Sequence, residues 1–276
     1  MTDLLTKSDY EEPQCLLNMH PEITPIPVSR IIEKLDSYLD RNDYGAAERH
    51  LCYWLSEAEA GCDMRGKLTV LNEQIGLYRK TGKKKECLEV ITTALELSDS
   101  LGIENSATYG TTLVNAATGY KAFGKAKEAL PLYRRAKTVY EAVLDRDDGR
   151  LAGLYNNMAL TLTELKEFRE AEELFHQAMA ILEKQKNGEL EIAITCLNLA
   201  DLVAAESGLE AGENEIEKLL LKAEELLDTE SLPRDGYYAF VCEKCAPVFG
   251  YYGYFLTEQE LNRRAREIYD RASAAE

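Results

Sequence analysis

The chain has 276 residues, 45% of them hydrophobic, and a formal net charge of −17 at pH 7, so it can bury a large core in one or two domains. Nucleic acid and anionic membrane surfaces are both disfavoured as partners, because binding to either needs clustered lysine and arginine. No apolar run approaches the ~20 residues of a membrane span, and the acidic N-terminus fits no signal segment. We therefore expect a cytoplasmic protein.

Residues 1–28 precede the helical part of the sequence and contain the stretch PEITPIPV. Its prolines, Pro21, Pro25 and Pro27, forbid a helix and favour an extended conformation. A disordered leader that ends at Ser29, the expected N-cap of the first helix, is the plainer interpretation. The segment is nevertheless apolar enough that we expect residues 23–28 to pack on the first helix pair as an N-terminal cap.

From Ser29 onward, apolar residues recur at the i, i+3, i+4, i+7 spacing of amphipathic helices, which come in pairs. The pairs repeat every 42 residues, since small core residues fall at Cys87, Ala129 and Ala171. Gly82 and Gly124 fall at the turn inside two successive pairs, where a residue that can adopt a positive φ is useful. The pattern predicts helices throughout and no strand.

This spacing of large, small and aromatic residues resembles the tetratricopeptide repeat, whose usual unit has about 34 residues. The longer period here, with phrases such as EALPLYRRAKTVYEAVL and YNNMALTLTEL, is similar to the kinesin light chain type. The resemblance implies an all-α, right-handed superhelical solenoid of about six antiparallel helix pairs over residues 29–276. In this family the first helix of each pair lines a concave groove, so the fold supplies binding rather than chemistry.

The last two repeats depart from the pattern. The fifth carries about four extra residues in the stretch AAESGLEAGENE between its helices, and we expect a loop there. The sixth, from Pro233 on, has Cys242, Cys245, Ala246 and Phe249 on its core stripe and is the most aromatic part of the chain. Aromatic rings exposed there would mark a surface for homodimerisation or for a partner.

The predicted groove is lined by residues one helical face away from the core stripe of each first helix. Asparagines recur there at Asn115, Asn157 and Asn198, while the second repeat has Glu73. An asparagine amide carries an acceptor and a donor, which match the C=O and N–H of an extended peptide. We therefore predict a peptide-binding groove, whose other residues are Asn156, Thr111, Thr118, Leu160, Lys80 and Lys121. In the alternative interpretation, the asparagines bond to the adjacent repeat and fix the stacking.

Cationic residues near the predicted groove are few, namely Arg79, Lys80 and Lys121, all toward one end. Tetratricopeptide domains of the chaperone-adaptor type capture a C-terminal carboxylate with such residues, because a carboxylate needs charge-assisted donors. Kinesin light chain grooves are basic and accept acidic peptides, from which a chain of net charge −17 departs. A neutral or basic protein segment is therefore the expected partner.

No catalytic motif is apparent. The three histidines, His20, His50 and His176, accompany no nucleophile motif, Gly-rich phosphate loop or HExxH sequence. The seven cysteines are scattered through helical segments and do not suggest a disulfide framework. Cys242 and Cys245 have metal or redox spacing, but both occupy core positions, so we expect buried thiols. The sequence thus predicts a non-enzymatic protein without a cofactor or a metal.

Two further functions stay open. One is a peptide-sensing regulator similar to the bacterial pheromone receptors, whose repeat grooves also bind peptide backbones through asparagines; it would lack their effector domain, because residues 1–28 are too few for one that binds DNA. The other is an assembly subunit whose groove holds a neighbouring subunit.

Overall fold

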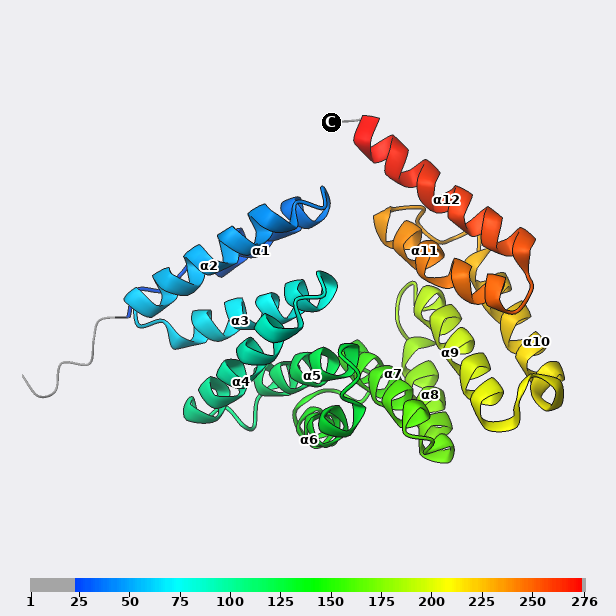
Figure 1. Ribbon diagram of the computed structural model, residues 1–276, viewed down its shortest axis with the longest axis horizontal. Helices are drawn as coiled ribbons and strands as arrows, with labels where there is room; N and C mark the ends of the chain where they lie inside the picture. Colours follow the sequence, from blue (N-terminus) through cyan, green and yellow to red (C-terminus); the bar gives the residue numbers. More distant parts are fainter. Residues whose placement is uncertain (1–22, 275–276) are drawn as a thin grey trace, which may run out of the picture. The chain divides into compact units, whose positions relative to one another are not determined.

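The computed structural model describes residues 23–274, and the expectations for residues 1–22 lie outside this range. Within it, the chain forms twelve α-helices and no strand (Figure 1), which confirms the all-α repeat fold. The helices are α1 (Val28–Leu39), α2 (Tyr44–Ala60), α3 (Met64–Lys80), α4 (Lys84–Ser100), α5 (Ala107–Ala122), α6 (Ala126–Val143), α7 (Gly149–Glu164), α8 (Phe168–Leu182), α9 (Glu189–Ser207), α10 (Leu209–Leu227), α11 (Gly236–Tyr251) and α12 (Phe255–Ala274). They divide into two compact units, unit 1 up to Gly102 and unit 2 from Ile103 on.

Short polar side chains start many of these helices. The carboxylates of Asp43, Asp63 and Asp148 each accept a backbone N–H at 2.9 Å in the first turn of α2, α3 and α7. Ser106 and Asp235 do the same for α5 and α11. Such caps satisfy N–H groups that have no partner inside the helix. Much of the division into helices is therefore encoded locally in the sequence.

The turn inside a helix pair has the same backbone geometry in three successive repeats. Gly82 and Gly124 both have a φ of 71°, which confirms the predicted left-handed turn. Lys166 occupies the equivalent position of the next repeat and has a φ of 64°. A side chain makes this conformation unfavourable. The packing of the helix pair therefore imposes the turn even where the sequence does not favour it.

Unit 1 consists of α1–α4, and its core includes one residue from the N-terminal segment. Ile26 is 8% exposed and packs with Ile31 and Leu35 of α1, whereas Ile23 is 62% exposed. The backbone N–H of Ile26 donates to the carboxylate of Asp63 at 3.0 Å. Residues 23–27 are thus tied to the turn between α2 and α3 as well as to α1.

The expected N-cap of α1 was wrong. The helix begins at Val28, and the residue before it, Pro27, has no side-chain hydrogen bond to the first turn. The proline ring restricts φ, here −80°, and its carbonyl oxygen accepts the N–H of Ile31 at 3.1 Å. The helix can therefore start one residue before Ser29 and without a side-chain cap.

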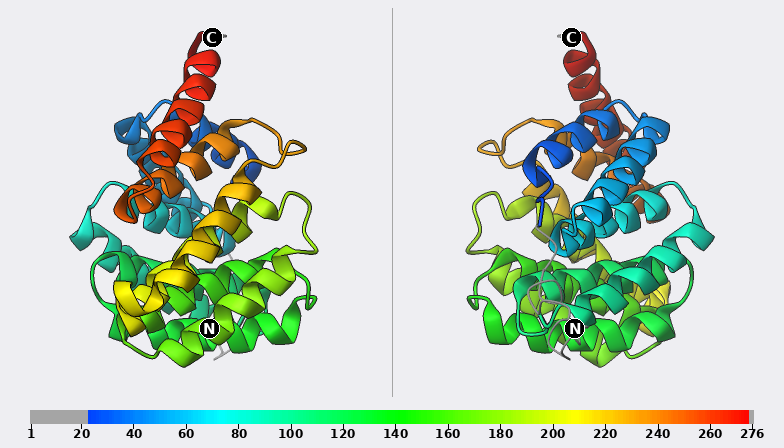
Figure 2. Two further views of the ribbon diagram at one scale, coloured as in Figure 1. Left: turned by 90° about the vertical axis from the view of Figure 1, so that its right-hand side faces the viewer. Right: turned by 90° about the vertical axis from the view of Figure 1, so that its left-hand side faces the viewer.

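Unit 2 consists of four helix pairs, α5–α6 to α11–α12, which follow one another from green through yellow to red in Figure 2. Small residues such as Ala129 and Ala171 are fully buried where the helices approach each other. Consecutive first helices (α5, α7, α9 and α11) approach each other to within 8 Å between Cα atoms, whereas consecutive second helices do not do so to a comparable extent. The first helices therefore form the inner layer of the curved unit.

The predicted loop in the fifth repeat was also wrong. A single residue, Gly208, with a φ of 82°, separates α9 from α10, and the extra residues lengthen both helices to 19 residues. Most residues of the stretch are good helix formers. Gly212 then lets α10 lie close to α9, because a Cβ atom there would come within 2.7 Å of Val203 Cγ1.

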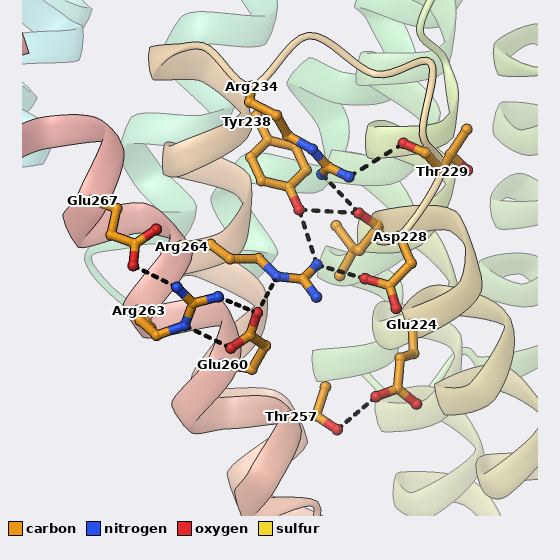
Figure 3. A network of polar contacts seen from close by, with 11 residues as sticks. Glu224, Asp228, Thr229, Arg234, Tyr238, Thr257, Glu260, Arg263, Arg264 and Glu267 are labelled. Atoms are coloured by element: carbon orange, nitrogen blue, oxygen red, sulfur yellow. Dashed lines mark hydrogen bonds and ion pairs between the residues drawn. The ribbon is translucent and has the colours of Figure 1, made fainter. Parts of the chain in front are cut away.

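A polar network holds α12 against the end of α10 and the start of α11 (Figure 3). The guanidinium of Arg264 donates to Asp228 at 2.5 Å, to Glu260 at 2.8 Å and to the hydroxyl of buried Tyr238 at 3.1 Å. Hydrogen bonds from Arg263 and Arg264 lower the pKa of Glu260 to about 2. The last helix is therefore fixed by charge-assisted hydrogen bonds as well as by its buried face.

Candidate binding surface on the first helices of unit 2

Except for Asn156 and Lys121, the predicted groove residues of unit 2 fall on one helical stripe of their first helices, and α11 has an equivalent stripe. We call these four stripes the inner face. Its residues are Thr111, Asn115, Thr118 and Ala122 of α5; Gly153, Asn157, Leu160 and Glu164 of α7; Ile194, Asn198, Asp201 and Ala205 of α9; and Tyr237, Phe240, Lys244, Pro247 and Tyr251 of α11. Because the first helices are the inner layer of the unit, these side chains share one surface.

The three asparagines of the predicted ladder, Asn115, Asn157 and Asn198, are all half-buried on this face. Asn157 donates one N–H to the carbonyl of Gly153 at 2.9 Å, inside its own helix, while its Oδ1 accepts no hydrogen bond from residues 23–274. The amide of Asn198 makes no side-chain hydrogen bond within the same range. Two of the three amides therefore keep hydrogen-bonding capacity for a ligand.

Asn156 has a different environment from the ladder. Its Nδ2 donates to the hydroxyl of Thr195 at 3.0 Å, and that hydroxyl lies 3.2 Å from Asn156 Oδ1. Thr195 is fully buried and belongs to α9. This contact joins the first helices of two successive repeats, which is the alternative role considered for an asparagine. The structure thus places the amide of Asn156 between repeats.

Thr111 and Thr118 lie on the inner face, but their hydroxyls are bonded toward the core. Thr111 Oγ1 is 2.8 Å from the hydroxyl of Tyr140, and Thr118 Oγ1 is 2.9 Å from that of Tyr133. Each also donates to a carbonyl one turn earlier in α5. The two threonines therefore fix buried tyrosines of α6.

The remaining predicted residues are distributed over both units. Leu160 and Lys121 are half-buried on α7 and at the end of α5, in unit 2. Lys80 is exposed at the end of α3, in unit 1, where its ammonium lies 5.5 Å from the ring centroid of Tyr44. Only Lys121 of these two cations thus belongs to the same compact unit as the asparagines.

Two carboxylates add negative charge on α9. Burial raises the pKa of Glu191 above its ordinary value, an effect that nearby Lys244 opposes. Burial likewise raises the pKa of Asp201, although Asp201 Oδ1 accepts a hydrogen bond of 2.9 Å from Tyr252. The hydroxyl of Tyr237 is hydrogen-bonded to Glu191. Tyr237 of α11 and Tyr252, the residue after its end, thus contact the two carboxylates and join α11 to α9.

Comparison with known protein families identifies part of unit 2. A sequence model of the tetratricopeptide repeat family matches residues 110–148 and 151–184, which span most of α5–α8. Residues 110–148 and 151–184 thus match tetratricopeptide repeats. The matched residues carry Asn115 and Asn157, so two of the three ladder asparagines lie inside tetratricopeptide units.

Solved structures of kinesin light chain-like proteins have a similar fold. One is BtubC (BKLC) from P. vanneervenii, at 20% identity and a TM-score of 0.64 over 75% of this chain and 83% of that one. Another is a putative kinesin light chain with nearly identical TPR-like repeats from Podosopora anserina, at 17% identity and a TM-score of 0.54 over 75% and 96%. No curated protein matches the sequence of this chain. The predicted resemblance to tetratricopeptide repeats of the kinesin light chain type is thereby confirmed.

Sequence reasoning expected exposed aromatic rings in the last helix pair but placed no groove residue there. On α11 the inner-face stripe is Tyr237, Phe240, Lys244, Pro247 and Tyr251, and its three aromatic side chains are 46%, 50% and 70% exposed. The rings of Tyr237 and Phe240 stack with centroids 6.2 Å apart. The signal was present, because a core stripe through Cys242, Cys245 and Phe249 fixes which residues face inward.

The two cysteines of the CEKC stretch are buried in this pair. Cys242 and Cys245 are at most 1% exposed, and burial raises the pKa of both thiols, that of Cys245 to about 12. Within residues 23–274, no group of three or more His, Cys, Asp or Glu side chains could hold a metal ion. Nor does any helix in that range have the length and apolar character needed to cross a membrane.

Proposed function

We propose that the protein is a non-enzymatic cytoplasmic adaptor whose unit 2 holds an extended segment of a partner protein along the inner face. Tetratricopeptide repeats are in general protein-interaction scaffolds, which supports the class of function. All six cysteines in the described part of the chain are free, and Cys52 is exposed, which suits a reducing compartment.

The observation that carries the proposal is the hydrogen-bonding state of the ladder. Asn157 and Asn198 sit at equivalent positions of successive first helices, and both retain amide groups that residues 23–274 leave without a hydrogen bond. An extended backbone offers an N–H and a C=O at regular intervals, so successive amides can each bind it in the same way. The ladder would therefore provide affinity, while neighbouring side chains would provide specificity.

The charges of the inner face favour a neutral or basic segment over an acidic one. Of the cations predicted for the groove, only Lys121 lies in unit 2, because Lys80 belongs to unit 1. The inner face itself carries one cation, Lys244, and two carboxylates, Glu164 and Asp201, with Glu191 beside it. Capture of a carboxylate would need several charge-assisted donors. A basic partner instead gains from a surface of opposite sign.

The proposal can be tested with peptides selected from a random nonapeptide library by binding to the full-length protein. For a selected peptide, Asn157→Ala should weaken binding by about 1–3 kcal/mol, as expected for hydrogen bonds lost at a desolvated site. Isothermal titration calorimetry gives this value, and the melting temperature should remain near that of the wild type. Asn262→Ala, on the exposed side of α12, is the matched control. A lower melting temperature with unchanged binding would show that Asn157 stabilises the stacking of neighbouring repeats instead.

A second copy of the chain is the alternative partner, favoured by exposed apolar side chains around the turn between α11 and α12. Tyr251, Phe255 and Leu256 are 70%, 61% and 84% exposed there, and adjacent apolar side chains of this size often mark interfaces. Native mass spectrometry distinguishes the two functions. A dimer that Leu256→Ser dissociates would support self-assembly, whereas a monomer with a co-purified peptide would support the adaptor.

A further inference from the structure

Two adjoining hollows lie at the α11 end of the inner face. The first, of about 490 Å³, lies between α9 and α11, and the second, of about 550 Å³, lies between α10 and the turn that follows α11. They share three residues, Leu209, Tyr251 and Tyr252. Leu209 and Tyr251 are 53% and 70% exposed. Together the two hollows, which we call the tyrosine hollow, offer apolar and aromatic surface that residues 23–274 leave uncovered.

The charged residues that line the tyrosine hollow are all acidic. They are Asp201, Glu210, Glu213 and Glu217, and no lysine or arginine of the described chain lines either part. None of these four carboxylates takes part in an ion pair within residues 23–274. The pKa of Tyr254, at the rim, is raised by burial and then by the charges of Glu217 and Glu224. The hollow therefore presents a negative potential without an internal counter-charge.

The aromatic residues suit the same kind of ligand. Tyr251 and Tyr252 lie edge to face, with centroids 5.0 Å apart, and the Tyr252 hydroxyl orients Asp201 through its hydrogen bond. A cation is attracted to the face of an aromatic ring, and an aliphatic stem packs on apolar surface such as that of Leu209. A guanidinium group can also stack on tyrosine while it donates two parallel hydrogen bonds to a carboxylate.

We propose that the tyrosine hollow binds an arginine side chain of the partner segment, with Asp201 as its carboxylate partner and Tyr251 as its aromatic surface. This inference rests on the proposed function, since Asp201 and Tyr251 belong to the inner face itself. It adds the side-chain specificity that a backbone-binding ladder lacks. The segment would run along the asparagines and place an arginine at the α11 end of unit 2.

The test uses two immobilised pools of random nonapeptides that differ only at the central position. That position is arginine in one pool and citrulline, its uncharged isostere, in the other. Biolayer interferometry should show that the full-length protein binds the arginine pool about tenfold more tightly, as expected for charge-assisted hydrogen bonds. Asp201→Asn, which keeps an acceptor for Tyr252, and Tyr251→Ala should each remove most of this preference. Glu225→Gln, at an exposed carboxylate elsewhere on α10, should leave it unchanged.

Each result decides between the two proposals. Equal binding of both pools, weakened by Asn157→Ala, would overturn the arginine site and leave the proposed function intact. Failure of both pools to bind would overturn both proposals. Displacement by spermidine as effective as that by an arginine peptide of equal concentration would assign the hollow to free polyamines and overturn the peptide site. Melting curves of the variants confirm that each is folded.

Discussion

Gly110 shows how closely the helices of unit 2 approach at the scale of single residues. A Cβ atom at Gly110 of α5 would lie 2.3 Å from Tyr140 Cε1 of α6. The ring cannot move easily, because Tyr140 is 3% exposed and its hydroxyl is hydrogen-bonded to Thr111. Glycine is needed here for space rather than for a positive φ.

Gly110→Ala should therefore lower the free energy of unfolding by about 1–3 kcal/mol, as overpacking does in a rigid core. The matched control is Gly153→Ala on α7, where an added Cβ meets no atom within 4 Å. Alanine there should stabilise the helix by up to roughly 1 kcal/mol, because it loses less backbone entropy than glycine. Urea unfolding measures both values, and equal changes in the two variants would contradict the close-packing argument.

Asp201 leads to a prediction about pH. Its pKa is raised in the folded protein, so its charged form is disfavoured by folding. Below the unfolded pKa of about 3.9, the group is protonated in both states and has no such effect. As pH rises through the folded pKa, the destabilisation develops fully. Asp201→Asn should hence raise the melting temperature at pH 7, by a gain that shrinks toward pH 4.

If the Asp201→Asn variant had the same melting temperature as the wild type at both pH values, the predicted destabilisation by charged Asp201 would be contradicted. Glu225→Gln again serves as the control. Together with the binding test, the measurement would show whether a carboxylate that destabilises the free protein is retained for its ligand.

At the scale of elements, the helix pairs follow from the sequence more completely than their connections do. The left-handed turn at Gly82 and Gly124 was predicted because glycine marks it, but Lys166 holds the same φ without any such mark. The junction at Gly208 was wrongly predicted as a loop, because the extra residues allowed either a loop or longer helices. The close contact between Gly212 of α10 and Val203 of α9 distinguishes longer helices from a loop, and it involves both helices.

The candidate site was predictable to a similar degree. The 42-residue period placed Asn115, Asn157 and Asn198 on one face, since it determines which way a helical residue points. It could not show that Asn156 bonds to Thr195, 39 residues further along the chain. That contact depends on how neighbouring repeats stack, and a single helix pattern does not contain it.

Arg264 carries a prediction for the last helix. Its guanidinium contacts α10, α11 and its own helix through Asp228, Tyr238 and Glu260. Arg264→Gln should reduce stability by about 1–3 kcal/mol, since it leaves a half-buried polar network without its central donor. Arg263→Gln, which removes contacts only on the more exposed side of α12, should cost less than about 1 kcal/mol. Hydrogen exchange in α12 should rise in the first variant alone.

The same network sets a response to acid. The folded pKa of Glu260, about 2, lies below its unfolded value. Its contribution to stability is therefore present above the unfolded pKa of about 4.3 and is lost as pH falls toward 2. In the Arg264→Gln variant this loss should be smaller, because one of the two arginines that lower the pKa is absent. An acid response identical to that of the wild type would exclude Arg264 from this role.

At the scale of the whole molecule, the two compact units predict that damage to one is confined to it. Ile26 contributes to the core of unit 1 only. Ile26→Ala should lower the free energy of unfolding of unit 1 by about 2 kcal/mol, which is at the lower end for a large-to-small substitution in a core. Hydrogen exchange should accelerate in α1–α3 and stay unchanged in α5–α12. The control, Ile23→Ala, alters a side chain that is 62% exposed.

Deletion of residues 1–27 extends this test to the predicted N-terminal cap. It removes Ile26 together with the hydrogen bonds from its N–H to Asp63 and from Thr24 to Gly61. The truncated protein should melt at a lower temperature and bind a hydrophobic dye such as ANS. If its stability and dye binding equalled those of the full chain, the segment would be a disordered leader and not a cap.

The buried cysteines allow the opening of each unit to be measured separately. Cys87 lies in unit 1, and Cys196, Cys242 and Cys245 lie in unit 2. Burial raises the pKa of all four thiols. A thiol-specific reagent reacts with thiolate, so it can modify these sulfurs only after the surrounding helices separate. Mass spectrometry of the peptides that the reagent modifies over time would thus record how often each unit opens, in a protein without any introduced cysteine.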